Sequence, residues 1–147
     1  ERDFLVNRYR VPQPRVELGQ SLVGLVHSAL DVSDGLAADL EHICEQSGVG
    51  ARVEIDSLPI SGALNRLLKC GLFRWDEVVS GGDDYELLCT APPAVSNSLS
   101  DLGMTCIGRI VRGSSADFLD SEGQLLPLTR RGYRHGADQT SRKSPRD

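Results

Sequence analysis

The segment over residues 28–48 constrains the fold of this chain most, because its hydrophobic pattern changes period there. Residues 28–32 have the composition of a buried strand. From residue 34 to residue 46 the apolar side chains recur at helical spacing instead, and Gly48 is typical of the position just after a helix end. The sequence therefore predicts a strand that leads directly into an amphipathic helix.

The predicted helix over residues 34–46 has one apolar face and several polar ones. The apolar residues follow the spacing i, i+4, i+7 and i+8: Leu36, Leu40, Ile43 and Cys44. The polar residues are expected on the other faces: Asp39, His42, Glu45 and Gln46. We interpret His42 as a solvent-exposed helix residue.

Strands and helices alternate along the rest of the chain. The patterns predict strands over residues 51–55, 85–90 and 105–111, with a further candidate over residues 116–119. They predict helices over residues 61–70 and 94–102, and a short helix or turn over residues 75–80. This order predicts an α/β or α+β layered domain, with a mixed β-sheet packed with helices and a candidate β-hairpin near residues 105–120.

The composition is that of a globular protein with one domain. The chain has 147 residues, of which 25% are charged and 39% hydrophobic. A net charge of −5 argues against a nucleic-acid surface, and no apolar run is long enough for a membrane span. The four cysteines lack CxxC spacing, and we interpret them as reduced, mostly buried thiols of a cytoplasmic protein: Cys44, Cys70, Cys89 and Cys106.

Three residues with side-chain oxygens stand where the predicted strand meets the helix: Asp31, Ser33 and Asp34. Asp31 and Ser33 are expected to project from the same side of the strand, with Asp34 at the N-cap of the helix. Gly35 would let a ligand approach the backbone closely. Carboxylates beside a helix N-terminus suit Mg²⁺ that carries a polyphosphate. The structural alternative is that Ser33 or Asp34 only caps the helix, while Asp31 is solvated.

A second polar cluster, SGGDDYE, occupies residues 80–86. Two glycines before two aspartates permit a tight loop with exposed backbone amides. Asp83 and Asp84 are candidates to hold a metal ion or to accept hydrogen bonds from a substrate. Glycine and aspartate are also common in ordinary turns, so a turn without a ligand is the alternative.

Tyr133 is an aromatic residue in an otherwise polar stretch, RRGYRH. Two roles are open for it: stacking on a substrate ring and packing on the domain surface. The sequence contains no GxxxxGK[ST] loop, no protein-kinase motif set and no GxSxG motif. Direct phosphoryl transfer needs no protein nucleophile, because it depends mostly on positioning and charge neutralisation. We therefore predict no catalytic residue in the strict sense.

Together, four segments resemble the C-terminal domain of thiamine-monophosphate kinase, a member of the aminoimidazole ribonucleotide synthetase superfamily. The segments are ALDVSDGLAADLEHICEQSGVGARVEIDSLPIS, SGGDDYELLCT, IGRI and GYRH, and the resemblance runs from about residue 9 to residue 135. It implies the fold of that superfamily's C-terminal domain. It also implies Mg²⁺-dependent transfer of the ATP γ-phosphate to thiamine monophosphate, which gives thiamine diphosphate.

The same resemblance implies roles for individual residues. Asp31 and Asp34 would be metal ligands, and Ser33 would contact ATP. Asp83 would contact the thiamine phosphate substrate, although the family usually has Glu at this position and Asp is one methylene shorter. Tyr133 would be the aromatic residue that stacks on the substrate.

The resemblance also predicts a domain organisation. Residues 1–17 would be an interdomain linker, residues 18–135 the C-terminal substrate- and phosphate-binding domain, and residues 136–147 a flexible tail. The family's N-terminal ATP-binding domain, which supplies most metal-binding aspartates and the dimer interface, is absent from this sequence. We therefore expect the isolated chain to be inactive and the full-length protein to be a homodimer.

Two other functions are compatible with these residues. The first is a non-catalytic protein that binds thiamine phosphates or a partner, which the shorter side chain of Asp83 favours. The second is another ATP-dependent synthetase of the superfamily, one that makes aminoimidazole ribonucleotide or selenophosphate. The combination of SDGL with DYELL fits that second class less well.

Overall fold

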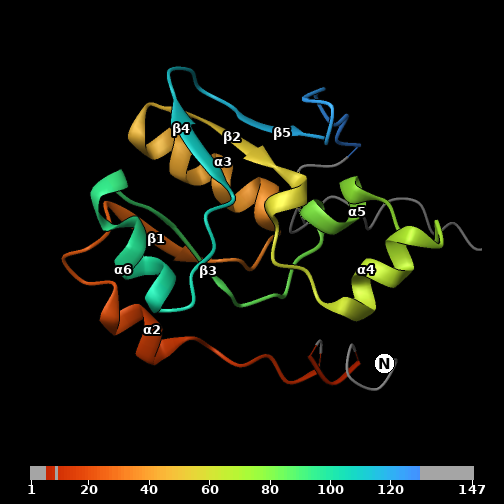
Figure 1. Cartoon of the computed structure of the whole chain (residues 1–147), viewed down its shortest axis with the longest axis horizontal. Helices are drawn as coiled ribbons and strands as arrows, with labels where there is room; N and C mark the ends of the chain where they lie inside the picture. The colour runs from red at the N-terminus through yellow and green to blue at the C-terminus, as the bar shows by residue number, and fades with distance from the viewer. Residues whose placement is uncertain (1–5, 9, 130–147) are drawn as a thin grey trace, which may run out of the picture.

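The computed structural model describes residues 6–8 and 10–129, in which helices pack with two small β-sheets (Figure 1). The elements in chain order are α2 (Val16–Ser21), β1 (Ser28–Asp31), α3 (Leu36–Ser47), β2 (Gly50–Glu54), the 3₁₀ turn η1 (Ile55–Ser57), α4 (Gly62–Lys69), α5 (Trp75–Ser80), β3 (Leu87–Thr90), η2 (Pro93–Val95), α6 (Ser96–Asp101), β4 (Gly108–Val111) and β5 (Ala116–Leu119). Each predicted strand and helix is present within a few residues of its expected position. Among these residues, no helix combines the length and apolar character needed to cross a membrane.

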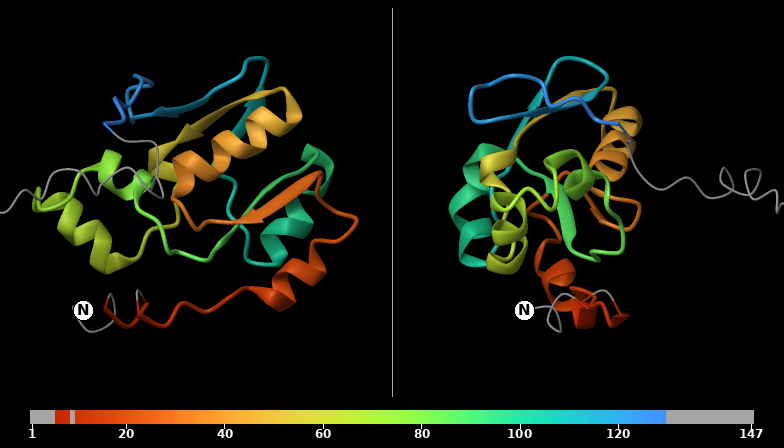
Figure 2. Two further views of the ribbon diagram at one scale, coloured as in Figure 1. Left: turned by 180° about the vertical axis from the view of Figure 1, so that it is seen from behind. Right: turned by 90° about the vertical axis from the view of Figure 1, so that its right-hand side faces the viewer.

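The strands form two sheets of different kinds. β1 and β3 form an antiparallel pair, and β2 is the central strand of a second sheet in the order β4-β2-β5. β4 pairs with β2 antiparallel and β5 pairs with it parallel, so this sheet is mixed, as predicted. The layered α/β prediction is also confirmed, because α3 contacts strands of both sheets (Figure 2).

The predicted hairpin near residues 105–120 is wrong. β4 and β5 flank β2 and do not pair with each other. The connection between them passes over Gly50 at the start of β2, where an added Cβ would lie 3.2 Å from the Cα of Gly113 and from the carbonyl oxygen of Ser115. Because Gly50 has no side chain, the connection can cross β2, and both strands then pair with a central neighbour.

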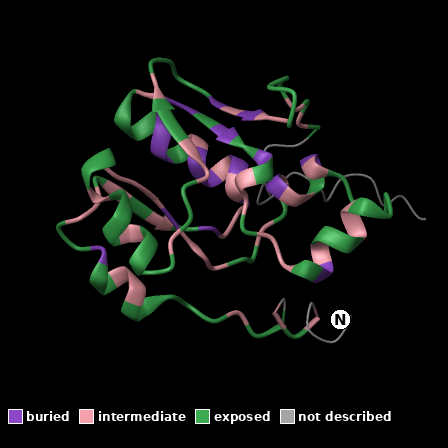
Figure 3. Ribbon diagram, in the orientation of Figure 1, coloured by how far each residue is buried: buried purple, intermediate pink, exposed green. Residues whose placement is uncertain are grey.

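The main core lies between α3 and the sheet centred on β2 (Figure 3). Along β2, Ala51 and Val53 are buried and Arg52 and Glu54 are exposed, which is the alternation of a sheet with one covered face. The predicted apolar stripe of α3 faces this core, with Leu36 as its half-buried end. Its other members are buried: Leu40, Ile43 and Cys44.

Helix α3 begins later than predicted. Its first residue is Leu36 and its N-cap is Gly35, so the prediction of Asp34 as N-cap is wrong. Gly35 has φ 112°, a conformation that glycine adopts at little cost. A right-handed helix needs a negative φ, so α3 cannot extend to residues before Gly35. The helix ends as predicted, since Gly48 is left-handed with φ 63°. Asp39, which was expected on a polar face, is instead only 5% exposed.

The four cysteines are free thiols, as predicted, but the prediction that most are buried is wrong. Cys44 is buried on α3 and Cys89 is half-buried on β3. Cys70 is the C-cap of α4, and Cys106 precedes β4. Both lie just outside a helix or strand and are exposed.

Candidate functional site

The two polar motifs found in the sequence lie side by side and are joined through their backbones. In the β1–β3 pair, Asp31 is opposite Leu87. The pairing continues beyond both strands: the amide of Val32 donates to the carbonyl oxygen of Glu86 at 2.8 Å, and the amide of Tyr85 donates to that of Val32 at 2.9 Å. The structure therefore places the loop after β1 against the loop before β3.

Two glycines allow this close approach. A Cβ on Gly35 would lie 2.8 Å from the carbonyl oxygen of Ser80, and one on Gly82 would lie 2.4 Å from the carbonyl oxygen of Ser33. Both distances are shorter than any real Cβ contact. Gly35 was predicted to admit a ligand, but protein backbone occupies that space. These glycines serve to bring the two loops together.

The loop before β3 has an unusual backbone at two residues. Asp83 has φ 68° and Tyr85 has φ 53°, the left-handed region that residues with side chains rarely adopt. The amide of Asp83 donates to the carbonyl oxygen of Ser33 at 2.9 Å. The hydrogen bonds from Asp83 and Tyr85 to the neighbouring loop hold these conformations, and the Asp83 side chain is exposed.

Asp39 is a site residue that sequence reasoning missed. One of its carboxylate oxygens, Oδ2, accepts hydrogen bonds from the amides of Ser33 at 2.9 Å and Asp34 at 3.0 Å. The helical pattern placed Asp39 on a polar face, although Asp39 lies three residues after Leu36 and four before Ile43, the spacing of neighbours on one helix face. The carboxylate on α3 thus fixes the loop that carries the candidate ligands.

Asp39 also belongs to a group of candidate metal ligands. Among residues 6–8 and 10–129, the group of three or more such side chains consists of Asp34, Asp39 and His42, with one ligand atom of each within 4.8 Å of the others. His42 is exposed, as predicted. Asp31 is not a member, and its side chain is exposed at the end of β1.

This donor set fits a divalent cation. Mg²⁺ prefers oxygen ligands and is usually held by one or two carboxylates together with phosphates and water. Asp34 and Asp39 provide carboxylates within reach of each other, and Asp39 has already engaged one oxygen with two amides. Of these two carboxylates, Asp34 is therefore the one more available to a cation.

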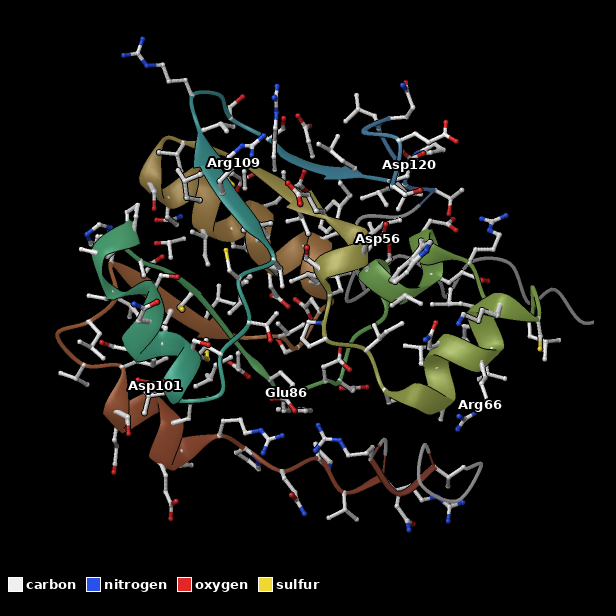
Figure 4. All side chains as sticks on the ribbon, in the orientation of Figure 1. Asp56, Arg66, Glu86, Asp101, Arg109 and Asp120 are labelled. Atoms are coloured by element: carbon white, nitrogen blue, oxygen red, sulfur yellow. The ribbon has the colours of Figure 1, made fainter. Side chains whose placement is uncertain are left out.

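Glu86, at the end of the second motif, binds two arginines of the N-terminal segment, Arg8 and Arg15. Its carboxylate accepts hydrogen bonds from Nη2 of Arg8 at 2.7 Å and from Nε and Nη2 of Arg15 at 2.9 and 2.8 Å. Figure 4 shows Glu86 between β3 and this N-terminal segment. The hydrogen bonds from Arg15 lower the pKa of Glu86, although its partial burial opposes them. The same contact raises the pKa of Arg15. No local pattern indicates this pairing, because the paired residues are 71 or more positions apart in the sequence.

Asp84 experiences the opposite electrostatic environment. Partial removal from water raises the pKa of its carboxyl group, and the negative charges of Glu86 and Asp83 raise it further. Arg8 opposes this effect. The loop therefore concentrates negative charge, part of which Arg8 and Arg15 neutralise.

A second feature of the described structure is a groove away from these two loops. It has a volume of about 480 Å³ and is lined mainly by apolar and aromatic side chains, including Phe73, Trp75 and Leu126. The buried carboxylate of Asp76, which also lines the groove, accepts hydrogen bonds from Arg74 and from Thr129, and these bonds lower the pKa of Asp76 to about 2. No predicted site residue lines this groove.

The structure thus brings together most of the predicted site residues. Ser33, Asp34 and Asp83 lie on two loops that hydrogen-bond to each other, and Asp31 lies at the adjacent strand end. Tyr133 is outside the described residues.

Known proteins resemble the chain over most of its length. The family described as AIR synthase related protein, C-terminal domain, matches residues 7–118. The thiamine-monophosphate kinase of Escherichia coli (strain K12) is 39% identical over 142 residues, which cover 92% of this chain and 43% of that protein. The chain therefore spans less than half the length of this curated relative.

Solved structures agree with this similarity. The thiamine-monophosphate kinase from Stenotrophomonas maltophilia K279a superimposes with a TM-score of 0.66 at 42% identity, over 78% of this chain and 37% of that one. AaThiL complexed with AMPPCP and TMP superimposes with a TM-score of 0.75 at 30% identity, over 89% of this chain and 40% of that one. With the match over residues 7–118, these similarities show that the chain belongs to the AIR synthase related family and corresponds to its C-terminal domain.

Proposed function

We propose that this chain is the C-terminal, substrate-side part of a thiamine-monophosphate kinase. The reaction would be Mg²⁺-dependent transfer of the ATP γ-phosphate to thiamine monophosphate, with thiamine diphosphate as product. Relatives with that name support the proposal, as does the similarity to a structure that contains AMPPCP and TMP. The observation that carries it is the hydrogen bond from Asp83 to Ser33, because it brings the two candidate ligand loops to one place.

The loop after β1 is proposed to serve the phosphates. Asp34 and Asp31 would hold Mg²⁺, which when bound would neutralise charge on the transferred phosphoryl group. Ser33 would contact ATP through its hydroxyl group. The backbone of Ser33 and Asp34 is held by Asp39, so these side chains start from a fixed loop.

The loop before β3 is proposed to serve the thiamine phosphate. Asp83 is exposed and would contact the substrate, and Tyr133 would stack on its ring. The reaction would need no nucleophile from the protein, since the phosphate oxygen of thiamine monophosphate attacks directly. The work of these residues is therefore to hold two substrates in line.

The remaining parts of the site are proposed to come from an N-terminal domain. The chain spans only 43% of the E. coli relative, and three or four side chains do not suffice to bind two phosphorylated substrates with their cations. We therefore expect binding of one substrate by this chain, and turnover only when it is joined to that domain.

The first test is thermal unfolding of the chain with and without thiamine diphosphate and Mg²⁺. A ligand at about 100 times its Kd stabilises a folded protein by roughly 2.7 kcal/mol, which is a shift of several degrees for a domain of this size. The shift should require Mg²⁺ and disappear in Asp34→Ala. Asp101→Ala, an exposed carboxylate on α6, is the matched control and should retain it.

The second test measures activity in the two-domain protein. Thiamine monophosphate should be phosphorylated, whereas selenide and formylglycinamidine ribonucleotide should not react. A correctly folded two-domain protein that does not turn over thiamine monophosphate would exclude the proposed reaction. Turnover of another substrate in the panel would instead support a different synthetase of the superfamily.

A further inference from the structure

Asp39 holds the backbone of the candidate site from a buried position. Its side chain is 5% exposed, and its Oδ2 atom lies 2.9 Å from the amide nitrogen of Ser33 and 3.0 Å from that of Asp34. A buried carboxylate is costly unless hydrogen bonds compensate for the lost water. These two amides supply that compensation.

The two hydrogen bonds do not serve the helix to which Asp39 belongs. Helix α3 has Gly35 as its N-cap, and the amides that a helix leaves unpaired are those of its first turn. Ser33 and Asp34 come before the N-cap, so their amides lie outside the helix. Asp39 therefore organises the loop, and a helix-capping role does not explain its contacts.

The peptide backbone of Ser33 is held on both sides. Its amide donates to Asp39, and its carbonyl oxygen accepts from the amide of Asp83. The first contact comes from α3 and the second from the loop before β3. The orientation of the loop that carries Ser33 and Asp34 is consequently determined by a buried carboxylate on α3 and by the loop before β3.

We propose that Asp39 is a positioning residue for the metal and phosphate loop, an inference that rests on the function proposed above. Asp39 accepts hydrogen bonds from the amides of Ser33 and Asp34. It thereby holds the Asp34 carboxylate in the orientation that binds a cation. Residues that orient a metal ligand without replacing it contribute about 10-fold to 100-fold to metal affinity in other proteins. A single oxygen atom makes both contacts, so an asparagine at this position can still accept them.

The test compares Asp39→Ala and Asp39→Asn with the unchanged chain, using Mn²⁺ as the probe because it takes the same oxygen ligands as Mg²⁺. Mn²⁺ affinity is measured by electron paramagnetic resonance at a temperature where every variant is folded. Asp39→Ala should weaken binding by about tenfold or more. Asp39→Asn should lose about fivefold or less, because its side-chain oxygen still accepts both amides. Glu45→Gln, which removes an exposed charge from the same helix, should bind Mn²⁺ normally.

Amide hydrogen exchange of Ser33 and Asp34 gives a second measurement that needs no metal. Exchange of both amides should be roughly tenfold faster or more in Asp39→Ala, and nearly unchanged in Asp39→Asn. A folded Asp39→Ala with normal exchange and normal Mn²⁺ affinity would overturn the proposal. So would an Asp39→Asn that keeps slow exchange but binds as weakly as Asp39→Ala, since Asp39 would then act through its charge.

The two measurements separate this inference from the proposed function. If the unchanged chain binds no Mn²⁺, the metal site proposed at Asp34 fails. The exchange rates of Ser33 and Asp34 still decide whether Asp39 holds the loop: faster exchange in Asp39→Ala supports that role, and unchanged exchange excludes it. A lower melting temperature alone does not support the inference, because any buried residue can lower it.

Discussion

The amide of Asp83 donates a hydrogen bond of 2.9 Å to the carbonyl oxygen of Ser33. This contact links two loops that are far apart in the sequence and that both carry candidate ligands. It extends the antiparallel pairing of β1 and β3 past the ends of both strands. The relative position of the loop after β1 and the loop before β3 is thus set by backbone hydrogen bonds, which depend little on which side chains the loops carry.

The first prediction concerns the glycine that permits this contact. Gly82→Ala should destabilise the domain by about 1–3 kcal/mol, because its Cβ would lie 2.4 Å from the carbonyl oxygen of Ser33 and would force the two loops apart. The measurement is urea-induced unfolding. Gly62→Ala, where the nearest atom is an Arg66 side-chain nitrogen at 3.8 Å, is the control and should be neutral or slightly stabilising. Equal stabilities of the two variants would contradict the role given to Gly82.

The second prediction separates the backbone role of Asp83 from its charge. Asn enters the left-handed region about as readily as Asp. Asp83→Asn should therefore change the free energy of unfolding by no more than a surface substitution does, about 0.5 kcal/mol. If the carboxylate contacts the substrate, the same variant should lose the stabilisation produced by thiamine diphosphate with Mg²⁺. Calorimetric titration of both proteins checks this. Normal binding by the Asn variant would remove Asp83 from the substrate site.

The third prediction concerns the ion pairs of Glu86. Glu86→Gln should release Arg15 and speed trypsin cleavage after that residue, since its guanidinium group then lacks a carboxylate partner. The loss of global stability should be small, about 1 kcal/mol or less, because these side chains are partly exposed. Cleavage is followed by mass spectrometry.

Two controls accompany that experiment. Glu17→Gln removes an exposed charge from α2 close to the same arginine and should not change the cleavage rate. High salt should accelerate cleavage of the unchanged chain toward the rate of the Gln variant, because salt screens exposed ion pairs. Identical rates for all three proteins at low salt would show that Glu86 does not restrain the N-terminal segment.

The fourth prediction is a pH dependence of stability that originates at Asp76. Its pKa falls from 3.8 to about 2 in the folded protein because Arg74 and Thr129 bind the ionised carboxylate. The contribution of the Asp76 carboxylate to the free energy of unfolding is therefore fully present above pH 3.8 and is lost as the pH falls through about 2. The difference in melting temperature between the unchanged chain and Asp76→Asn should shrink over this interval.

Other carboxylates titrate in the same range, so a control is needed. Glu86 also has a lowered pKa and loses its contribution at acidic pH in both proteins. The comparison with Asp76→Asn cancels that common loss. A constant difference between the unchanged chain and Asp76→Asn across the interval would mean that its ion pair does not stabilise the fold.

Local patterns in the sequence determined much of this protein. Apolar residues at helical spacing predicted α3, and Gly48 predicted its end, because a helix face and a left-handed turn depend on residues close in the chain. The same local reading found the two acidic glycine motifs. Their residue types already indicated cations and phosphates as the chemistry to expect.

Only the tertiary structure decided how these parts meet. Gly50 allows β4 and β5 to flank β2 where a hairpin was expected, and Asp39 is buried because two loop amides compensate its charge. Glu86 accepts hydrogen bonds from Arg15, which lies 71 positions earlier in the sequence. Each outcome depends on contacts between residues distant in sequence. Short-range periodicity carries no information about them, since it records which face of an element is apolar and not which neighbour covers it.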